Sequence, residues 1–275
     1  MGRLTGILAH PLDLLNGLPF AITILMILLA HEMGHYLACR YYGIDATLPY
    51  VIPVPPFIIL GPSTVVPFNP FGTFGAVIKI RSQFPDRRQL FDVGIAGPLA
   101  GFVFIIPSLI VGLQLSTQHT FADPVQGTLE FGEPLIFRLA AMAFFPGEAD
   151  AAISLHPIGW AAWFGMLATS INLLPVGQLD GGHIVYGLFG ARPHRIISYV
   201  TFGALIGISL YSRPMLGYLV FAVVLLFIGF RHPRPLMEFP RLGRGRILIA
   251  LIGLIIFVLT FMPVPVRLIQ HVARL

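Results

Sequence analysis

Five consecutive residues, His31-Glu32-Met33-Gly34-His35, combine side-chain types and a spacing that suit metal-dependent hydrolysis. On a helix, residues four positions apart lie one above the other on one face, so both histidines can bind one zinc ion. Glu32 lies off that line but close enough to exchange a proton with a water that zinc activates. The motif therefore predicts a zinc peptidase centre with Glu32 as its catalytic base.

The motif lies in an apolar stretch, Leu18–Cys39, that contains no other charged side chain. The stretch is long enough for a helix to cross a hydrocarbon core of about 30 Å. Ionisable groups within a membrane span are costly and are functional by default. We therefore expect the metal site to lie within the bilayer, and this first span to act as an uncleaved insertion signal.

The composition of the chain is that of an integral membrane protein. Of its 275 residues, 56% are hydrophobic and only 11% are charged, against about 25% charged in soluble domains. The basic residues behind the net charge of +5 are not interleaved with aromatic ones, so we expect contact with lipid headgroups and no nucleic acid partner. Cys39 is the only cysteine, which excludes an intrachain disulfide and predicts a packed, inert thiol.

Six apolar intervals between charged residues are expected to cross the membrane, which predicts an all-α polytopic fold with a small re-entrant β segment. The expected spans are Leu18–Cys39, Val93–Leu115, Ala151–Leu179, Ile196–Ser212, Pro214–Phe230 and Ile247–Val266. Residues 1–190 form the expected catalytic core, and residues 191–275 form the C-terminal transmembrane helices. The segment Ser116–Ala149 is too short for a typical appended domain.

Basic residues predict the orientation of these spans. With the N-terminus outside, 12 of the 17 basic residues fall in inner segments and the other 5 in outer ones. Cytoplasmic loops carry such an excess, so both termini and residues 122–150 are expected outside, and residues 40–88 and 231–246 in the cytoplasm. His31 and His35 then lie near the cytoplasmic end of their span.

The apolar segment Ile44–Ile80 cannot be a spanning helix, because seven prolines interrupt it. Its last part, Gly72–Ile80, predicts a turn that leads into a strand. One interpretation is a loop on the membrane surface. The other is a short re-entrant sheet beside the metal site, with an edge that can accept another strand.

Two histidines leave a catalytic zinc ion one protein ligand short of the usual three. The sequence Asn172-Leu173-Leu174-Pro175-Val176-Gly177-Gln178-Leu179-Asp180-Gly181-Gly182-His183 is the best source of the third. Asp180 is the only acidic residue between Asp150 and Glu238, and it follows a long apolar stretch. Pro175 and Gly177 are expected to break the helix there. Asp180 is thus either the third ligand or a helix cap at the membrane surface.

Three motifs together resemble the site-2 protease family of intramembrane zinc metallopeptidases. They are the HEMGH sequence, the glycine-rich Gly94–Gly101 segment and the NLLPVGQLDGGH sequence, and the resemblance covers about residues 20–190. It implies one zinc ion per chain held by His31, His35 and Asp180, with Glu32 as the catalytic glutamate. The substrate-contacting positions that it implies are Asn172, Pro175, Gly72, Phe74, Gly75 and Val77. The better-known members carry a PDZ or CBS module, which these residues do not contain.

The remaining motif residues have open or supporting roles. Asn172 either donates to the developing oxyanion or bonds to the backbone of the broken helix. His183 is expected close to the metal site as a supporting residue that is not a ligand. The glycines Gly94, Gly97 and Gly101 are expected to let the second span pack closely against the metal-binding helix.

These observations predict a zinc-dependent endopeptidase that cleaves a membrane-anchored protein within or near its transmembrane segment, as in regulated intramembrane proteolysis. We expect it in a prokaryotic inner membrane, with the active site toward the cytoplasm. The alternative is a transporter or metal carrier, which the absence of an inverted repeat and the presence of Glu32 disfavour. Prenyl-protein proteases also carry HExxH but take a downstream glutamate as third ligand, and Glu238 lies in an expected loop.

Overall fold

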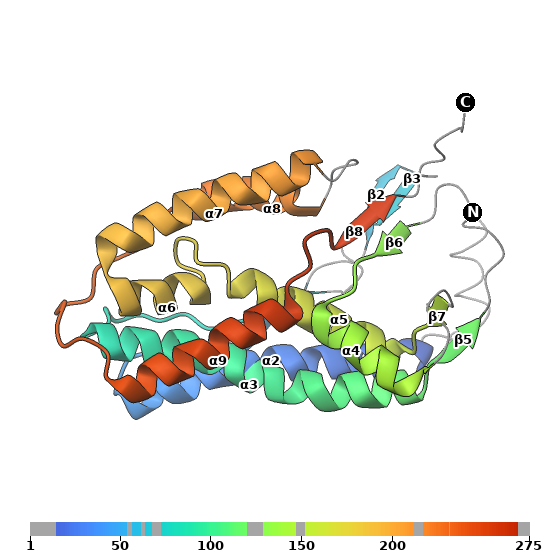
Figure 1. Cartoon of the computed structure of the whole chain (residues 1–275), viewed down its shortest axis with the longest axis horizontal. Helices are drawn as coiled ribbons and strands as arrows, with labels where there is room; N and C mark the ends of the chain where they lie inside the picture. Colours follow the sequence, from blue (N-terminus) through green and yellow to red (C-terminus); the bar gives the residue numbers. More distant parts are fainter. Residues whose placement is uncertain are drawn as a thin grey trace.

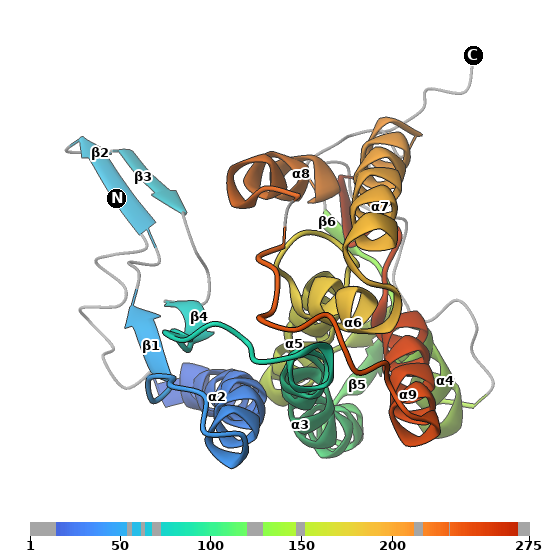
Figure 2. The ribbon, with the colours of Figure 1, turned by 90° about the vertical axis from the view of Figure 1, so that its left-hand side faces the viewer.

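The computed structural model describes residues 15–53, 57–61, 64–67, 73–119, 129–146, 152–211, 217–230 and 232–268. Two long helices, α2 (Leu18–Tyr41) and α3 (Arg87–Gln114), lie side by side along one edge of the molecule (Figures 1 and 2). Both match the first two expected spans. Within the described residues, they are the two helices long and apolar enough to cross a membrane, by length and composition.

The third expected span, Ala151–Leu179, is not one continuous helix. The structure places a short strand, β7 (Ala152–Ser154), before helix α5 (Pro157–Asn172), and a helix break follows. The helix begins at Pro157 because proline suits the first helical position, and His156 accepts the Ile158 N–H as its cap. The expected break at Pro175 and Gly177 is confirmed, since no helix continues between Leu173 and Leu179.

After the break, the described residues form four helices. They are α6 (Asp180–Phe189), α7 (Ala191–Tyr211), α8 (Gly217–Ile228) and α9 (Arg244–Thr260). The last three overlap the three expected C-terminal spans, and α9 ends at Thr260, short of the predicted Val266. The structure therefore confirms a mostly helical fold without confirming six membrane crossings.

The segment after α3 contains an apolar helix that the sequence analysis did not predict. Helix α4 (Leu135–Phe144) packs on α3, and strands β5 (Thr117–His119) and β6 (Leu129–Phe131) precede it. β5 pairs with β7, and β6 pairs with β8 (Val266–Leu268). Each of these sheets joins segments far apart in the chain, which is why local patterning gave no signal for them.

The expected β segment is confirmed in its described part. Strand β1 (Tyr50–Pro53) pairs antiparallel with β4 (Thr73–Val77), and β2 (Phe57–Gly61) pairs with β3 (Thr64–Pro67). Among the described residues, β4 has one sheet neighbour, so its second edge is not covered by a strand. Gly72, which the sequence analysis assigned to the turn, lies outside the described residues.

The core forms where α2, α3 and α5 meet. Ile27, Ile105, Leu109, Trp163 and Met166 are almost completely buried there. The outer faces are apolar as well: seven large aliphatic side chains of α9, from Ile247 to Val258, are 43–61% exposed. A soluble helix of this length would carry polar residues on that face, so these surfaces suit a lipid environment.

Close approach between α2 and α3 depends on glycine. A Cβ atom built on Gly97 would overlap the imidazole ring of His35, and one on Gly34 would overlap the Ala96 carbonyl. Gly101 lies opposite His31, where an added Cβ would be 3.3 Å from the histidine Cβ. The expected packing of the glycine-rich segment against the metal-binding helix is confirmed.

A polar cluster of Tyr42, Asp92 and Arg246, which the sequence pattern does not indicate, connects α2, α3 and α9. Arg246 of α9 donates through Nε and a terminal nitrogen to both carboxylate oxygens of Asp92, at 2.6–3.0 Å. Tyr42, which follows α2, donates to the same carboxylate at 2.5 Å. Fork-shaped pairing of this kind is among the stronger polar contacts, and here it links α2, α3 and α9.

The glycine contact gives a test by substitution. Gly97→Ala should lower the free energy of unfolding by about 1–3 kcal/mol, because the added methyl group must displace His35. Gly203→Ala is the matched control, since Gly203 is helical and has nothing within 4 Å of its added Cβ. That change should stabilise the protein by about 0.5–1 kcal/mol through helix propensity. Thermal unfolding in detergent measures both, and equal stabilisation by the two changes would contradict the packing argument.

Candidate metal centre

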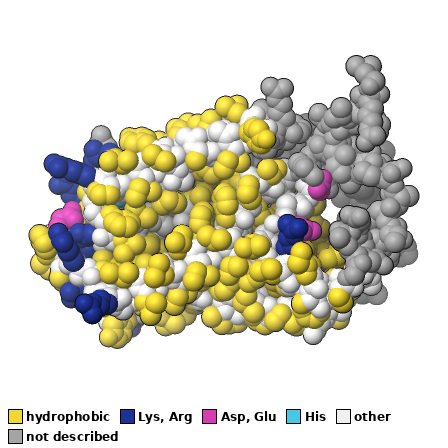
Figure 3. All heavy atoms as spheres, in the orientation of Figure 1, with side chains coloured by type: hydrophobic (Ala, Val, Ile, Leu, Met, Phe, Trp, Pro, Cys, Tyr) yellow, Lys and Arg dark blue, Asp and Glu magenta, His cyan; other side chains and the backbone are white. Residues whose placement is uncertain are grey.

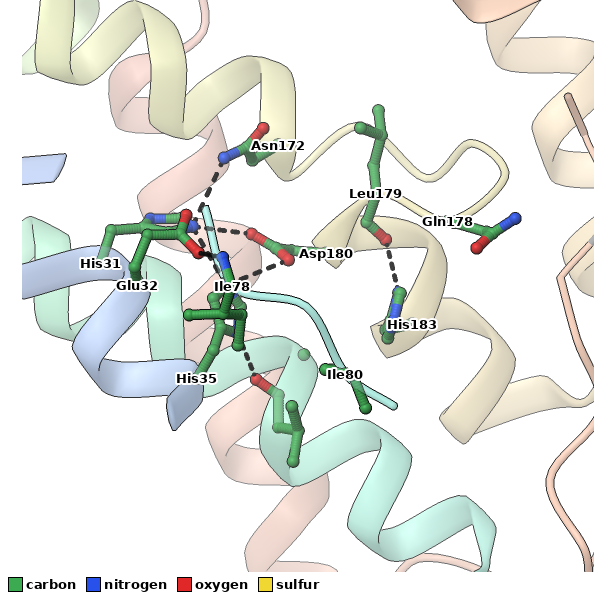
Figure 4. A pocket seen from close by; sticks show the side chains of 12 residues that line it. His31, Glu32, His35, Ile78, Ile80, Asn172, Gln178, Leu179, Asp180 and His183 are labelled. Atoms are coloured by element: carbon green, nitrogen blue, oxygen red, sulfur yellow. Dashed lines mark hydrogen bonds and ion pairs between the residues drawn. The ribbon is translucent and has the colours of Figure 1, made fainter. Parts of the chain in front are cut away.

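His31 and His35 lie one helical turn apart on the face of α2 that packs against α3. Their side chains are almost fully buried, at 5% and 7% exposed. The two Nε2 atoms are 3.1 Å apart. The predicted register of the motif is therefore correct, and both ring nitrogens face the same point (Figure 4).

Asp180 reaches that point from α6, 149 residues further along the chain. Its Oδ2 lies 3.0 Å from His31 Nε2, and its Oδ1 lies 3.2 Å from His35 Nε2. Asp180 is the first residue of α6, where unpaired backbone N–H groups and the helix dipole stabilise a negative charge. The helix start thus favours the ionised carboxylate that a metal ligand requires.

The broken segment before Asp180 is held in place from α7. Ser198 Oγ accepts the Gly177 N–H and donates to the Pro175 carbonyl, at 3.3 and 3.2 Å. The buried His194 donates through Nε2 to the Gly177 carbonyl at 3.0 Å. Gly177 adopts a left-handed conformation with φ of +53°, which a residue with a side chain rarely tolerates. These bonds fix where α6, and with it Asp180, begins.

The Val93 carbonyl fixes the tautomer of His35. His35 Nδ1 lies 2.7 Å from that carbonyl, so Nδ1 carries the proton and Nε2 of the neutral ring keeps its lone pair. Metal-binding histidines are commonly oriented in this way. When the ring is neutral, the Nε2 lone pair faces Asp180 Oδ1 at 3.2 Å. If the carboxylate is ionised, neither of these two atoms carries a proton, so they cannot form a hydrogen bond with each other.

The donor set fits a zinc ion. All three ligand atoms lie within 4.8 Å of one another, and this is the one such group among the described residues. In a tetrahedral site with Zn–N bonds of about 2.0–2.1 Å, neighbouring donor atoms lie about 3.3 Å apart. The separations of 3.0–3.2 Å between the three residues are close to that value. Two imidazoles and one carboxylate are also a ligand set that zinc takes in hydrolases.

Glu32 lies beside the ligands and is held by the β segment. Its Oε2 accepts the backbone N–H of Ile78 at 3.1 Å, directly after β4 (Figure 4). The backbone N–H and carbonyl of the next residue, Lys79, bond instead to Thr47, which lies on the same side of the strand as β1. Because backbone groups alternate along a strand, the edge that carries the Ile78 N–H faces the metal centre.

Asn172 ends α5 with its amide directed at the same point. Its Nδ2 lies 3.4 Å from His31 Nε2, and the described residues give this amide no bond to the backbone of the broken segment. That placement directs the amide toward the ligands. Asn172 and the ligands share a cavity of about 240 Å³, which Ile78, Ile80 and Gln178 also line.

His183 lines the cavity without approaching the ligands as a fourth donor. Its Nδ1 lies 3.0 Å from the Leu179 carbonyl, as a supporting residue would. The structure brings His232 against it, with ring centroids 4.6 Å apart, and His194 near His232. Burial and then the proximity of His183 lower the pKa of His232 to about 3, so its ring is neutral at pH 7. His194 and His232 lie near proposed span ends or in loops, so their positions in the sequence indicate no site.

The structure therefore gathers six of the predicted residues around one cavity. His31, Glu32, His35, Asn172, Asp180 and His183 line it. Phe74, Gly75 and Val77 lie in β4, before the residue that contacts Glu32, and Pro175 lines a different cavity. Sequence patterns carry no signal for the bond of the Val93 carbonyl to His35 or for the bond of the Ile78 N–H to Glu32, since both are backbone groups.

Comparisons with known proteins agree with this geometry. The profile of Peptidase family M50 matches residues 19–211. A probable chloroplastic zinc metalloprotease of Arabidopsis thaliana, EGY1, is 35% identical over 260 residues, which are 90% of this chain and 43% of that protein. EGY2 of the same plant is 31% identical over 232 residues, 81% of this chain and 37% of that protein. The chain spans less than half the length of these relatives.

The relatives are plant proteins, so they give no support to the expected prokaryotic inner membrane. Their names as zinc metalloproteases agree with the ligand set that the structure brings together. The chain belongs to Peptidase family M50, the site-2 protease family that its motifs resemble.

Proposed function

We propose that the chain is a zinc-dependent intramembrane endopeptidase that cleaves a membrane-anchored protein within or near its transmembrane segment. One observation carries the proposal: His31, His35 and Asp180 converge to within 4.8 Å. His31, His35 and the neighbouring Glu32 belong to α2, a helix long and apolar enough to span a bilayer. A metal carrier needs the ligands but has no use for Glu32, so the peptidase is favoured.

His31 Nε2, His35 Nε2 and the Asp180 carboxylate hold the zinc ion in this proposal. When bound, zinc is a Lewis acid that makes water nucleophilic near neutral pH and polarises a carbonyl group. Glu32 receives the proton of the attacking water on its carboxylate and passes it to the leaving amine nitrogen. The Ile78 N–H, at 3.1 Å, keeps that carboxylate in position. Asn172 donates through Nδ2 to the developing oxyanion.

The substrate must unwind before its scissile carbonyl is accessible, because a transmembrane helix satisfies every backbone group internally. Each unpaired group in lipid costs several kcal/mol. We propose that the uncovered edge of β4 replaces the lost hydrogen bonds by pairing with the unwound strand. Ala76 lies two residues before Ile78, so its backbone groups face the same side. The preferred substrate should carry a helix-weakening residue near the cut.

The membrane topology is part of the proposal. We retain six crossings, both termini outside, a catalytic part in residues 1–190 and a C-terminal membrane part in residues 191–275. Figure 3 supports the orientation, because basic side chains gather at the end where α3 and α9 begin. That end also carries Arg40 at the end of α2, close to the metal centre, so cleavage is expected toward the cytoplasmic side.

Zinc content and cleavage should separate the two roles in the motif. His31→Ala, His35→Ala and Asp180→Ala should each lower bound zinc, because two remaining ligands hold it poorly. Glu32→Gln should keep zinc yet lower cleavage of a single-span reporter peptide by about 10²–10⁴-fold, the range for loss of a general base. Metal analysis and a fluorescent cleavage assay measure both. Zinc loss in Glu32→Gln equal to that in His31→Ala would overturn the assignment.

Proline at position 78 tests the support of Glu32 by the strand. Ile78→Pro removes the N–H that the Glu32 carboxylate accepts, so cleavage should fall at least tenfold while zinc content is unchanged. Ile78→Val is the matched control, since it keeps the N–H and a branched side chain, and its activity should stay within twofold. Normal cleavage by Ile78→Pro would mean that neither Glu32 positioning nor strand pairing needs this backbone group.

Cysteine labelling tests the orientation. In a Cys39→Ala background, a cysteine at exposed Glu133 should react with a membrane-impermeant maleimide from outside intact cells. A cysteine at exposed Leu236 should react only after the membrane is opened. The reverse pattern would invert the topology.

A further inference from the structure

A second cavity, of about 570 Å³, lies between α6 and α9. Its walls are aliphatic and aromatic, and include Leu173, Val185, Leu188, Leu251 and Leu254. The size falls within the range of about 300–1,000 Å³ that is usual for small-molecule sites. The metal cavity is separate: none of the residues that line one of the two lines the other.

Arg241 is the one charged residue among the described residues that line this cavity. Its backbone carbonyl accepts Arg88 Nε at 3.1 Å, but no described acidic side chain pairs with its exposed guanidinium. Figure 3 shows basic side chains gathered at this end of the molecule, where α9 begins. The cavity therefore has a cationic rim and an apolar interior.

The cavity opens on the lipid-facing side of α9. Leu251 and Leu254 line it and are nevertheless 51% and 56% exposed. A molecule in the surrounding bilayer can reach it laterally, without crossing the protein. A molecule bound there must place an apolar chain in the cavity and a negative charge beside Arg241.

We propose that this cavity binds one anionic phospholipid, with an acyl chain between α6 and α9 and the phosphate at Arg241. Basic sites at the rim of transmembrane helices bind anionic headgroups, and each buried methylene adds to the affinity. A peptide helix fits less well: at about 10 Å diameter and 5.4 Å pitch, one turn occupies roughly 420 Å³. The cavity would hold little more than one turn.

The position of the lipid gives it a structural role at the metal centre. Leu173, Pro175 and Gly181 form part of the cavity wall, and they flank the segment that ends at Asp180. An acyl chain packed there would restrain the α5–α6 break from the side opposite α7. The proposal rests on the proposed membrane location and not on the peptidase chemistry.

Native mass spectrometry of the full chain in detergent tests the proposal. The probes are phosphatidylglycerol and phosphatidylcholine with identical palmitoyl and oleoyl chains. The unmodified protein should retain one phosphatidylglycerol, with at least fivefold preference over phosphatidylcholine. Arg241→Gln should abolish the preference, and Leu251→Trp should lower retention of both lipids at least fivefold by filling the cavity.

Matched variants separate this site from general lipid association. Arg244→Gln and Leu248→Trp change a neighbouring arginine and an exposed leucine of α9 that do not line the cavity, so retention should stay within twofold. The proposal would be overturned if Arg244→Gln reduced lipid preference as much as Arg241→Gln and Leu248→Trp reduced lipid retention as much as Leu251→Trp. Equal retention of the two lipids by the unmodified protein would also overturn it. Displacement of the lipid by a single-span apolar peptide would instead make the cavity a helix site and also overturn it.

Zinc analysis keeps the two proposals apart. Arg241→Gln and Leu251→Trp should retain zinc, and His35→Ala should retain phosphatidylglycerol. If lipid selectivity fails while zinc and cleavage persist, the lipid site alone is disproved. Val185→Phe, on the opposite wall, replaces Leu251→Trp if that variant does not fold.

Discussion

The contact of His35 with α3 is the interaction on which the rest of the structure depends. The ring occupies the space that any side chain at Gly97 would fill, and its Nδ1 is bound to the Val93 carbonyl. Both partners belong to one helix, so the spacing of α2 and α3 and the tautomer of the ligand are set together. A wider spacing would free the ring to rotate and would leave a buried imidazole N–H unpaired, which is costly in a low-dielectric interior.

Much of this centre could be predicted from the sequence, because its ligands follow simple rules. The helical spacing of His31 and His35 places them on one face, and Asp180 stands out as an isolated acidic residue after a helix break. The two long helices were predictable for the same reason, since an uninterrupted apolar stretch has few other structures available. Glycine spacing in Gly94–Gly101 likewise predicted close packing, which the structure confirms.

Other parts of the centre were not predictable, because they depend on backbone atoms or on distant contacts. Val93 and Ile78 act through a carbonyl and an N–H, which every residue except proline carries in the same form. The pairing of Arg246 with Asp92 joins residues 154 positions apart, and the separation alone hides it. Helix α4 was missed because a ten-residue apolar helix is too short to resemble a membrane span. The stretch Ala151–Leu179 is not one continuous helix, since apolar composition says nothing of where Pro157 starts a helix.

The division of the ligands between two parts of the chain has a thermodynamic consequence. Two ligands belong to α2, which is packed tightly on α3, whereas the third begins α6, which follows a break in the helix and is anchored to α7. A cation held by all three therefore adds a cross-link between α2 and α6 to the packing and hydrogen bonds that already join α6 to α3. Its binding energy becomes part of the energy that keeps α6 docked, growing by about 1.4 kcal/mol for each tenfold rise in free metal above the dissociation constant. Metal binding and the docking of α6 are thus thermodynamically coupled, so the concentration of free metal sets the stability of the folded bundle.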